Sequence, residues 1–137
     1  KHAAPPLRES DRGSVVAISS TSAKRPHPLR TPYTASKAAQ ITMMRAVAHE
    51  MGDDGVTANT VCPGPVAGDR IERVFQAAAD YMGVSAETVR ENLIGDMPLN
   101  EIVPPEDIAE MVAYLAGPDA RHISAQAINV DSGLAVY

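Results

Sequence analysis

The stretch Ser14-Val15-Val16-Ala17-Ile18-Ser19-Ser20 is a short, nearly continuous apolar run that ends in two hydroxyl side chains. Such a run is typical of a strand buried on both faces of a parallel sheet, because helices then cover both faces. Ligands of open parallel sheets bind at the carboxyl ends of the strands. The stretch therefore predicts a fold class and the edge of the sheet at which chemistry is expected.

The segments after this strand alternate between helix and strand. Residues from about 32 to 51 are apolar on more than one side and stop at Gly52-Asp53-Asp54-Gly55, which predicts a buried helix. Residues 56–62 are rich in β-branched side chains and stop at Pro63, and residues 127–131 form a third strand-like run. A strand, a helix and a strand in this order imply a right-handed parallel crossover. We therefore predict an α/β fold with a parallel, doubly wound, Rossmann-like sheet.

Residues 66–103 are a longer connection than a plain crossover needs. Two short helices are expected in it, at about 69–82 and 85–95, and the next helix begins at Pro104-Pro105. A long insertion after the carboxyl end of a strand is a common place for a substrate lid. We expect Phe75 and its apolar neighbours in this lid to contact the substrate.

Composition excludes several classes of function. The net charge of −5 argues against nucleic acid as the main partner. Cys62 is the only cysteine, so no internal disulfide can form, which fits a reducing cytoplasm. No apolar run approaches the ~20 residues of a membrane span. His49 and His122 have no partner at metal-ligand spacing. We expect a cytoplasmic protein without a nucleic-acid, membrane or metal partner.

The segment Tyr33-Thr34-Ala35-Ser36-Lys37 opens the first expected helix with a tyrosine and a lysine four residues apart. Positions i and i+4 lie on the same face of a helix, so the phenol and the ammonium can project to one place. An ammonium close to a phenol favours phenolate, which makes a tyrosine a usable general acid or base. The same spacing also fits a surface lysine that lies along a half-buried tyrosine. The neighbours of the pair must decide between these interpretations.

The sheet topology places those neighbours at the same edge as the pair. The hydroxyls after the first strand, the Tyr-Lys pair, the Pro-Gly turn after the second strand and the lid all belong to the carboxyl ends of the strands. In this combination the chain resembles the short-chain dehydrogenase/reductase family from Gly13 onward. The resemblance is carried by Ile18-Ser19-Ser20, Tyr33-Thr34-Ala35-Ser36-Lys37, Val61-Cys62-Pro63-Gly64-Pro65-Val66 and Asn129-Val130-Asp131-Ser132-Gly133.

The resemblance implies an NAD(P)-dependent oxidoreductase that interconverts a secondary alcohol and a ketone by hydride transfer. Tyr33 would exchange a proton with the substrate oxygen. Ser20, which is thirteen residues before Tyr33, matches the family's serine better than Ser19 and would hydrogen-bond that oxygen. Lys37 would hold the nicotinamide ribose and favour the phenolate. The implied contacts with NAD or NADP are Tyr33, Lys37, Pro63, Gly64, Pro65 and Val66.

The resemblance also implies parts that this sequence lacks. The family's glycine-rich turn for the pyrophosphate, its NAD-or-NADP selecting residue and the asparagine of its proton relay have no match here. Ala67 and Gly68 stand where the family often has a threonine or serine for the cofactor. We interpret residues 1–137 as the carboxyl-terminal part of a single domain, short of a complete one by about one hundred residues. Alone, the chain is expected to aggregate and to bind the cofactor poorly.

Other functions remain open on the sequence alone. The chain could be an inert, truncated half-domain that acts only in packing or interaction. An epimerase or dehydratase could use the same tyrosine and lysine, although such relatives are usually longer and lack this pattern after the second strand. The basic loop that contains Lys24, Arg25, His27 and Arg30 fits either a solvated loop or a site for an anionic substrate.

The expected partners are a small alcohol or ketone and further copies of the protein. The helix at 32–51 has more apolar surface than one sheet face can cover, and the resembling family commonly builds dimers and tetramers through this helix. We therefore expect a homodimer or homotetramer. Met44 is the position at which an introduced aspartate is expected to dissociate it.

Overall fold

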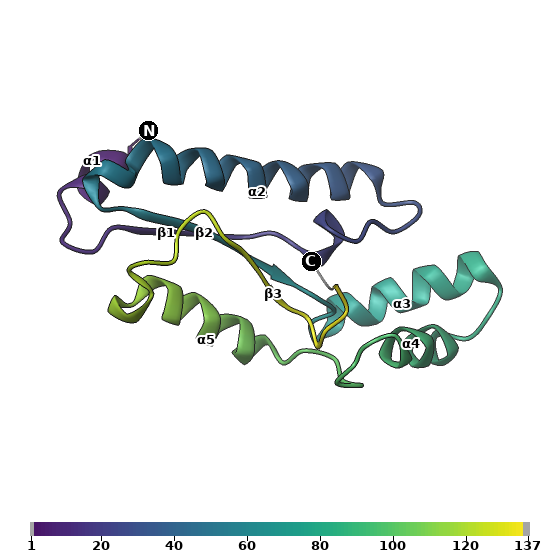
Figure 1. The fold of residues 1–137 in the computed structure, drawn as a ribbon. Helices are drawn as coiled ribbons and strands as arrows, with labels where there is room; N and C mark the ends of the chain where they lie inside the picture. Colours follow the sequence, from purple (N-terminus) through teal and green to yellow (C-terminus); the bar gives the residue numbers. More distant parts are fainter. Residues whose placement is uncertain (1, 136–137) are drawn as a thin grey trace.

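The computed structural model describes residues 2–135 as a three-stranded parallel sheet flanked by helices (Figure 1). The strand order is β1-β2-β3, with Ser14 opposite Thr57 and Thr60 opposite Ala127. The strands are β1 (Ser14–Ile18), β2 (Thr57–Pro63) and β3 (Ala127–Val130). The α-helices are α1 (Ala4–Arg8), α2 (Thr31–Met51), α3 (Asp69–Met82), α4 (Ala86–Gly95) and α5 (Pro105–Ala116). Short 3₁₀ helices are η1 (Thr21–Ala23), η2 (Gly52–Asp54) and η3 (Pro118–Ala120).

The two long helices cover opposite faces of the sheet. In Figure 1, α2 runs along one face and α5 along the other. Met44, Ala48 and Ala58 form the core on the α2 side, and Val61, Leu115 and Ala120 form it on the α5 side. Helices cover both faces of the middle strand, so β2 is buried from Ala58 to Pro63, including the polar residues Asn59 and Thr60. This arrangement confirms the predicted α/β fold with a parallel sheet.

The strand β1 is less buried than its sequence predicted. It pairs with β2 on one side, and no described strand lies on its other side. Its residues are half-buried, and Ile18 is 42% exposed. Both faces of β1 are nevertheless covered as expected, because Val15 and Ala17 pack on the α2 side and Val16 packs on the α5 side. An apolar run indicates a parallel strand but cannot tell a central strand from an edge strand.

The helix α2 directs its neighbouring methionines to different sides. Met44 is 4% exposed and packs with Ala48 against Ala58 of β2, whereas Met43 is 53% exposed. The expectation that Met44 lies on a subunit interface was wrong, because its side chain belongs to the core under the sheet. An aspartate there would bury a charge and disrupt the fold. Met43 is the exposed methionine of the pair.

The segment between β2 and α5 contains the two expected helices, which pack against each other as α3 and α4. Ser85 caps the start of α4, where a helix was expected, since its side chain accepts a hydrogen bond from the Thr88 N–H at 3.1 Å. Phe75 is 1% exposed, so it is an interior residue and does not present its ring to a ligand. Among the described helices, none is both long and apolar enough to cross a bilayer.

Candidate active site

The predicted site residues gather where the strands end. The chain leaves β1 at Ile18, turns through η1 and enters α2 at Thr31, while β2 ends at Pro63 just before the start of α3. Figure 1 shows η1, the first turn of α2 and the start of α3 at the same end of the molecule. The parallel register places the ends of β1 and β2 side by side, with Ile18 opposite Val61. The topology therefore brings together segments that are far apart in the sequence.

The two serines after β1 have different hydrogen bonds. The Ser19 hydroxyl donates to the backbone carbonyl of Lys37 at 2.7 Å, so it joins the strand end to α2. The Ser20 hydroxyl caps η1 by accepting a hydrogen bond from the Ser22 N–H at 3.1 Å. Accepting this bond orients the Ser20 oxygen and leaves its own O–H free to donate. Ser20 is therefore the better placed of the two to hydrogen-bond another oxygen.

Tyr33 and Lys37 lie together in the first turns of α2. The Lys37 ammonium is 5.8 Å from the centroid of the Tyr33 ring. It donates to the Ile18 carbonyl at 3.0 Å and to Gln40 Oε1 at 3.2 Å. An ammonium has three donors, so one N–H of Lys37 remains for a ligand. The Ile18 contact ties the lysine to the strand end that precedes Ser20.

Two arginines also lie against Tyr33: Arg30 of the basic loop, which the sequence left open between a solvated loop and an anion site, and Arg70, which it did not assign to the site. The guanidinium carbon of Arg30 is 5.9 Å from the centroid of the ring, and that of Arg70 is 5.8 Å from it. Arg30 is three residues before Tyr33, a spacing that could have pointed to it. Arg70 comes from α3, and no local pattern could have linked it to Tyr33. Gln40 was also missed, although it is one helical turn after Lys37.

The turn after β2 is held from two directions. The Gly64 N–H donates to the Val130 carbonyl at 3.0 Å. A Cβ on Gly64 would be 2.7 Å from Cβ of Asp131, so only glycine fits beneath the turn that closes β3. The Pro63 carbonyl accepts a hydrogen bond from Thr21 Oγ1 at 3.2 Å. The Pro-Gly motif and the closing Asp131 motif thus form one packed unit.

Val66 has a peptide edge that is free for a ligand. Val103 donates to the Pro65 carbonyl at 3.0 Å and accepts from the Ala67 N–H at 2.9 Å. Within residues 2–135, the N–H and C=O of Val66 itself have no hydrogen-bond partner. A donor and an acceptor on one residue match a carboxamide, which has an NH₂ donor and a carbonyl acceptor.

The basic loop divides into structural and site-facing residues. The Lys24 ammonium donates to the Ala127 carbonyl at 2.6 Å and to Asn129 Oδ1 at 2.7 Å. Arg25 donates to the Leu134 carbonyl at 3.1 Å and pairs with Asp96 at 3.0 Å. These two cations hold the end of β3 and the segment that follows it. Arg30 instead faces Tyr33.

Two side chains near the site have shifted pKa values. Burial, together with the positive charges of Arg25 and Arg30, lowers the pKa of His27 below its usual 6.5. Burial raises the pKa of the Cys62 thiol above its usual 9.0, although Lys24 acts in the opposite direction. Cys62 is a buried free thiol in β2 and packs as a small apolar residue.

A pocket of about 370 Å³ opens beside the Tyr33 ring. It is lined by side chains from the loop before α2, the start of α2 and the first turns of α3, namely Leu29, Arg30, Pro32, Tyr33, Arg70 and Val74. Phe75, which was expected to contact the substrate, is not among the lining residues. Its neighbour Val74 lines the pocket instead. In the part of the chain that the structure describes, no three metal-ligating side chains cluster.

Comparison with known proteins shows the family of the chain. The family model described as Enoyl-(Acyl carrier protein) reductase matches residues 1–135. A short chain dehydrogenase family protein from Francisella tularensis superposes with a TM-score of 0.82 at 29% identity, covering 90% of this chain and 51% of that one. The chain belongs to the short-chain dehydrogenase/reductase family. The predicted resemblance is thereby confirmed.

Other short-chain dehydrogenase/reductase members are similar over the same part of the chain. The actinorhodin polyketide ketoreductase with NADPH is 38% identical with a TM-score of 0.86, covering 91% of this chain and 48% of that one. The 3-oxoacyl-[acyl-carrier-protein] reductase of Rickettsia conorii is 33% identical over 122 residues, which are 89% of this chain and 46% of the relative. The chain spans about half the length of the curated relatives it matches. It therefore corresponds to a partial Rossmann-like domain.

Proposed function

We propose that the complete polypeptide containing this chain is an NAD(P)-dependent oxidoreductase that interconverts a secondary alcohol and a ketone. The observation that carries the proposal is the contact of Lys37 with both the Tyr33 ring and the Ile18 carbonyl, two residues before Ser20. Family members with reductase and dehydrogenase names, one of them a structure with NADPH, support it further.

In the proposed mechanism, Tyr33 transfers the proton. During reduction, its hydroxyl gives a proton to the carbonyl oxygen of the substrate, and the Ser20 O–H donates a hydrogen bond to the same oxygen. The Lys37 ammonium lies 5.8 Å from the centroid of the ring that loses the proton. In the oxidation direction the same groups accept the proton. Ser19 takes no part, since its hydroxyl is bound to the Lys37 carbonyl.

The residues present fit a nicotinamide cofactor, either NAD or NADP. The third N–H of Lys37 suits a ribose hydroxyl, and the unbonded N–H and C=O of Val66 suit the carboxamide, beside the Pro63-Gly64-Pro65 turn. When bound, the nicotinamide supplies or accepts the hydride. We propose residues 66–103 as the substrate lid, because Arg70 and Val74 of α3 line the pocket at Tyr33.

A deuteride-transfer assay tests the reaction. The complete polypeptide is incubated with C4-deuterated NADH or NADPH and a panel of ketones, and the carbinol carbon is examined for deuterium. Ser20→Ala is expected to lower kcat by about 10²-fold, the usual cost of losing one such donor. Ser19→Ala is the matched control and is expected to lose far less. Absence of transfer with every ketone and both cofactors contradicts the proposal.

The alternative is an inert half-domain that acts only in packing or interaction. Residues 1–137 alone, titrated with NAD and NADP by calorimetry, are expected to bind neither tightly, because a pyrophosphate needs backbone donors at a helix amino terminus that this part does not offer. Micromolar binding would contradict our assignment of the cofactor contacts. An intact mass from the natural source that matches 137 residues would favour the inert alternative.

We further propose that the enzyme is a cytoplasmic homodimer or homotetramer. The free thiol of Cys62 fits a reducing compartment. Met43 lies on the outer side of α2, where its apolar side chain is exposed. Met43→Asp is expected to lower the molar mass measured by light scattering, with Thr42→Asp at the adjacent exposed position as a comparison. A monomeric unmodified protein would contradict the proposal.

A further inference from the structure

We propose that Arg30 and Arg70 bind an anionic substituent of the substrate, a carboxylate or a phosphate, in the pocket beside Tyr33. The proposal deepens the proposed function and rests on it, because Tyr33 is taken as the group at which the carbonyl reacts. It names the chemical class of the substrate: a ketone with a negatively charged group a short distance from the reacting carbon.

The geometry brings the two guanidinium groups to one place. Their central carbons are 5.9 and 5.8 Å from the same Tyr33 ring centroid, although Arg30 precedes α2 and Arg70 belongs to α3. Both side chains also line the 370 Å³ pocket that borders this ring. A guanidinium offers a planar fork of donors that matches carboxylate and phosphate oxygens. The pocket therefore contains two anion-binding groups next to the candidate proton donor.

These charges have no counter-charge in the described part of the protein. The ion pairs there are Arg8 with Asp54 and Arg25 with Asp96, and neither Arg30 nor Arg70 makes a side-chain hydrogen bond. The Lys37 ammonium lies at the same ring as a third cation. Like charges around one ring repel one another, and the ring offsets the repulsion only in part. An anion in the pocket would relieve the repulsion, in a chain whose net charge is −5.

The rest of the basic loop supports a special role for Arg30. Lys24 and Arg25 are engaged with the end of β3, the segment after it and Asp96. Burial lowers the pKa of His27, and the positive charges of Arg25 and Arg30 lower it further. The wall of the pocket between the charges is apolar, formed by Leu29, Pro32 and Val74. A short methylene or acyl chain that carries the anion suits such a wall.

The test uses two matched pairs of substrates that differ only in charge. Acetoacetate is compared with ethyl acetoacetate for the carboxylate, and hydroxyacetone phosphate is compared with hydroxyacetone for the phosphate. The ratio of kcat/KM for the charged over the neutral member is measured for the complete polypeptide and for Arg30→Gln, Arg70→Gln and the double variant. Arg73→Gln, which removes an exposed arginine one turn along α3, is the charge-matched control.

We expect the ratio for one pair to fall about tenfold in each single variant, the usual cost of losing a hydrogen bond between charged groups. The double variant is expected to lose more, Arg70→Lys is expected to recover part of the loss, and Arg73→Gln is expected to keep the ratio. The pair that responds identifies the anion as carboxylate or phosphate. Unchanged ratios for both pairs, or equal losses for charged and neutral members, would overturn the proposal.

A binding measurement separates this proposal from the proposed function. If the unmodified protein reduces no ketone, the proposed function fails, and calorimetric titration with acetoacetate and with inorganic phosphate then decides the anion site. Binding by the unmodified protein that is lost in the double variant supports the site. If neither anion binds to the unmodified protein, the site is refuted. If neutral ketones are reduced while the ratios stay constant, only the anion site is refuted.

Discussion

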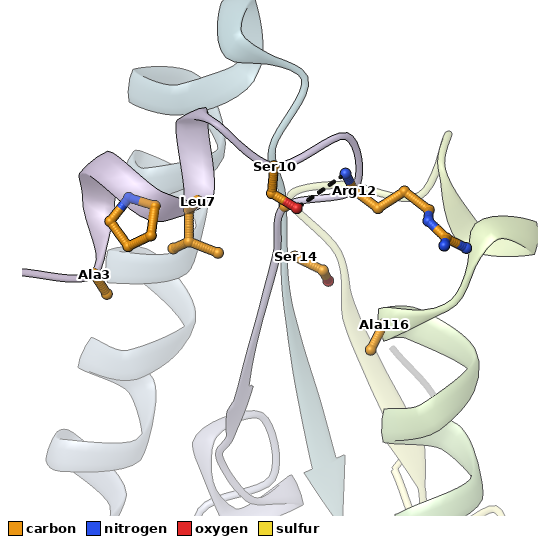
Figure 2. A pocket seen from close by; sticks show the side chains of 8 residues that line it. Ala3, Leu7, Ser10, Arg12, Ser14 and Ala116 are labelled. Carbon is orange, nitrogen blue, oxygen red and sulfur yellow. Dashed lines mark hydrogen bonds between the residues drawn. The ribbon is translucent and has the colours of Figure 1, made fainter.

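Two pockets lie at opposite ends of the sheet, and they differ in both size and chemistry. The pocket at the amino ends of the strands has a volume of about 460 Å³ and lies among α1, the start of β1 and the end of α5 (Figure 2). The pocket at the carboxyl ends is smaller, at about 370 Å³, and contains Tyr33 with two guanidinium groups. The larger pocket contains one charged side chain, that of Arg12; the backbone N–H of the same residue donates to Ser10 Oγ at 3.2 Å.

The difference shows that converging functional groups, and not volume, mark the candidate active site. At the amino ends, the lining is a short helix, a turn and the end of α5, so local packing explains it (Figure 2). At the carboxyl ends, a loop, the start of α2 and α3 direct a phenol and guanidinium groups to one place. Parallel strands end side by side, so the loops that follow them meet, and ligand sites form there. Substitutions at the two ends should therefore affect activity and stability differently.

The largest effect is expected from Tyr33→Phe, at the carboxyl end. Removing the hydroxyl removes the proposed proton donor, so kcat of the complete polypeptide should fall by about 10²–10⁴-fold while the cofactor dissociation constant changes little. Steady-state kinetics and a cofactor titration measure the two quantities. Ser10→Ala, in the larger pocket, is the control and should keep kcat. A Tyr33→Phe variant with more than about a third of the unmodified kcat would contradict the role of Tyr33 and the placement of the active site at the carboxyl ends of the strands.

Gly64→Ala should harm both stability and activity, because it lies at the carboxyl end and in a packed turn. The new Cβ would meet Cβ and Cα of Asp131 at 2.7 and 2.8 Å, so backbone must shift. We expect a loss of about 1–3 kcal/mol in the free energy of unfolding and a higher KM for the cofactor. Urea unfolding and kinetics measure the two effects. Gly95→Ala, where a Cβ would meet nothing within 4 Å, is the control.

Gly13→Ala should affect stability alone, because it lies at the amino end. Its Cβ would be 2.5 Å from the Leu7 carbonyl oxygen and 2.9 Å from Val56 Cγ2. The short helix α1 can yield, so we expect about 1 kcal/mol of lost stability, the low end of the cost of overpacking. The kcat of the folded fraction should stay at its unmodified value. A fall in kcat comparable with that of Gly64→Ala would show that the two ends are coupled.

The smallest effect is expected from His27→Gln, measured as the slope of stability against pH. Burial and the neighbouring arginines lower the pKa of His27 in the folded state below its usual 6.5. The unfolded state therefore binds more protons as the pH falls through about 6.5, and stability is lost down to the folded pKa. The variant should show a flatter decline in unfolding free energy between about pH 7 and pH 5. His49→Gln, at an exposed position of α2, is the matched control and should keep the slope of the unmodified protein. Equal slopes for His27→Gln and the unmodified protein would contradict the lowered pKa of His27.

Much of this fold followed from local patterns. The apolar runs and their stop signals predicted three strands and the helices between them, and Pro104-Pro105 and Ser85 marked helix starts that the structure contains. These features are readable because capping and periodicity depend on neighbours within a few residues. The family followed from the same motifs, and the match over residues 1–135 confirmed it.

Which residues of a helix face the core and which face outward was predicted less well. Met44 was expected on an interface and lies in the core, while Met43 is the exposed neighbour. Phe75 was expected at the substrate and is buried between helices, while Val74 lines the pocket. In each case the predicted residue is one position from the observed one. Hydrophobicity alone does not show which of two adjacent apolar residues faces the sheet, because the packing of other elements decides it.

The sequence by itself determined the parallel α/β fold, the family, and the Tyr33-Lys37 pair, because these depend on composition and on spacing within one element. The tertiary structure alone decided that Ser19 rather than Ser20 bonds to α2, and that Lys24 and Arg25 are structural. It also brought Arg70 of α3 to Tyr33 of α2. The physical reason is that such contacts join segments far apart in the chain, and only the packing of helices on the sheet sets their distance.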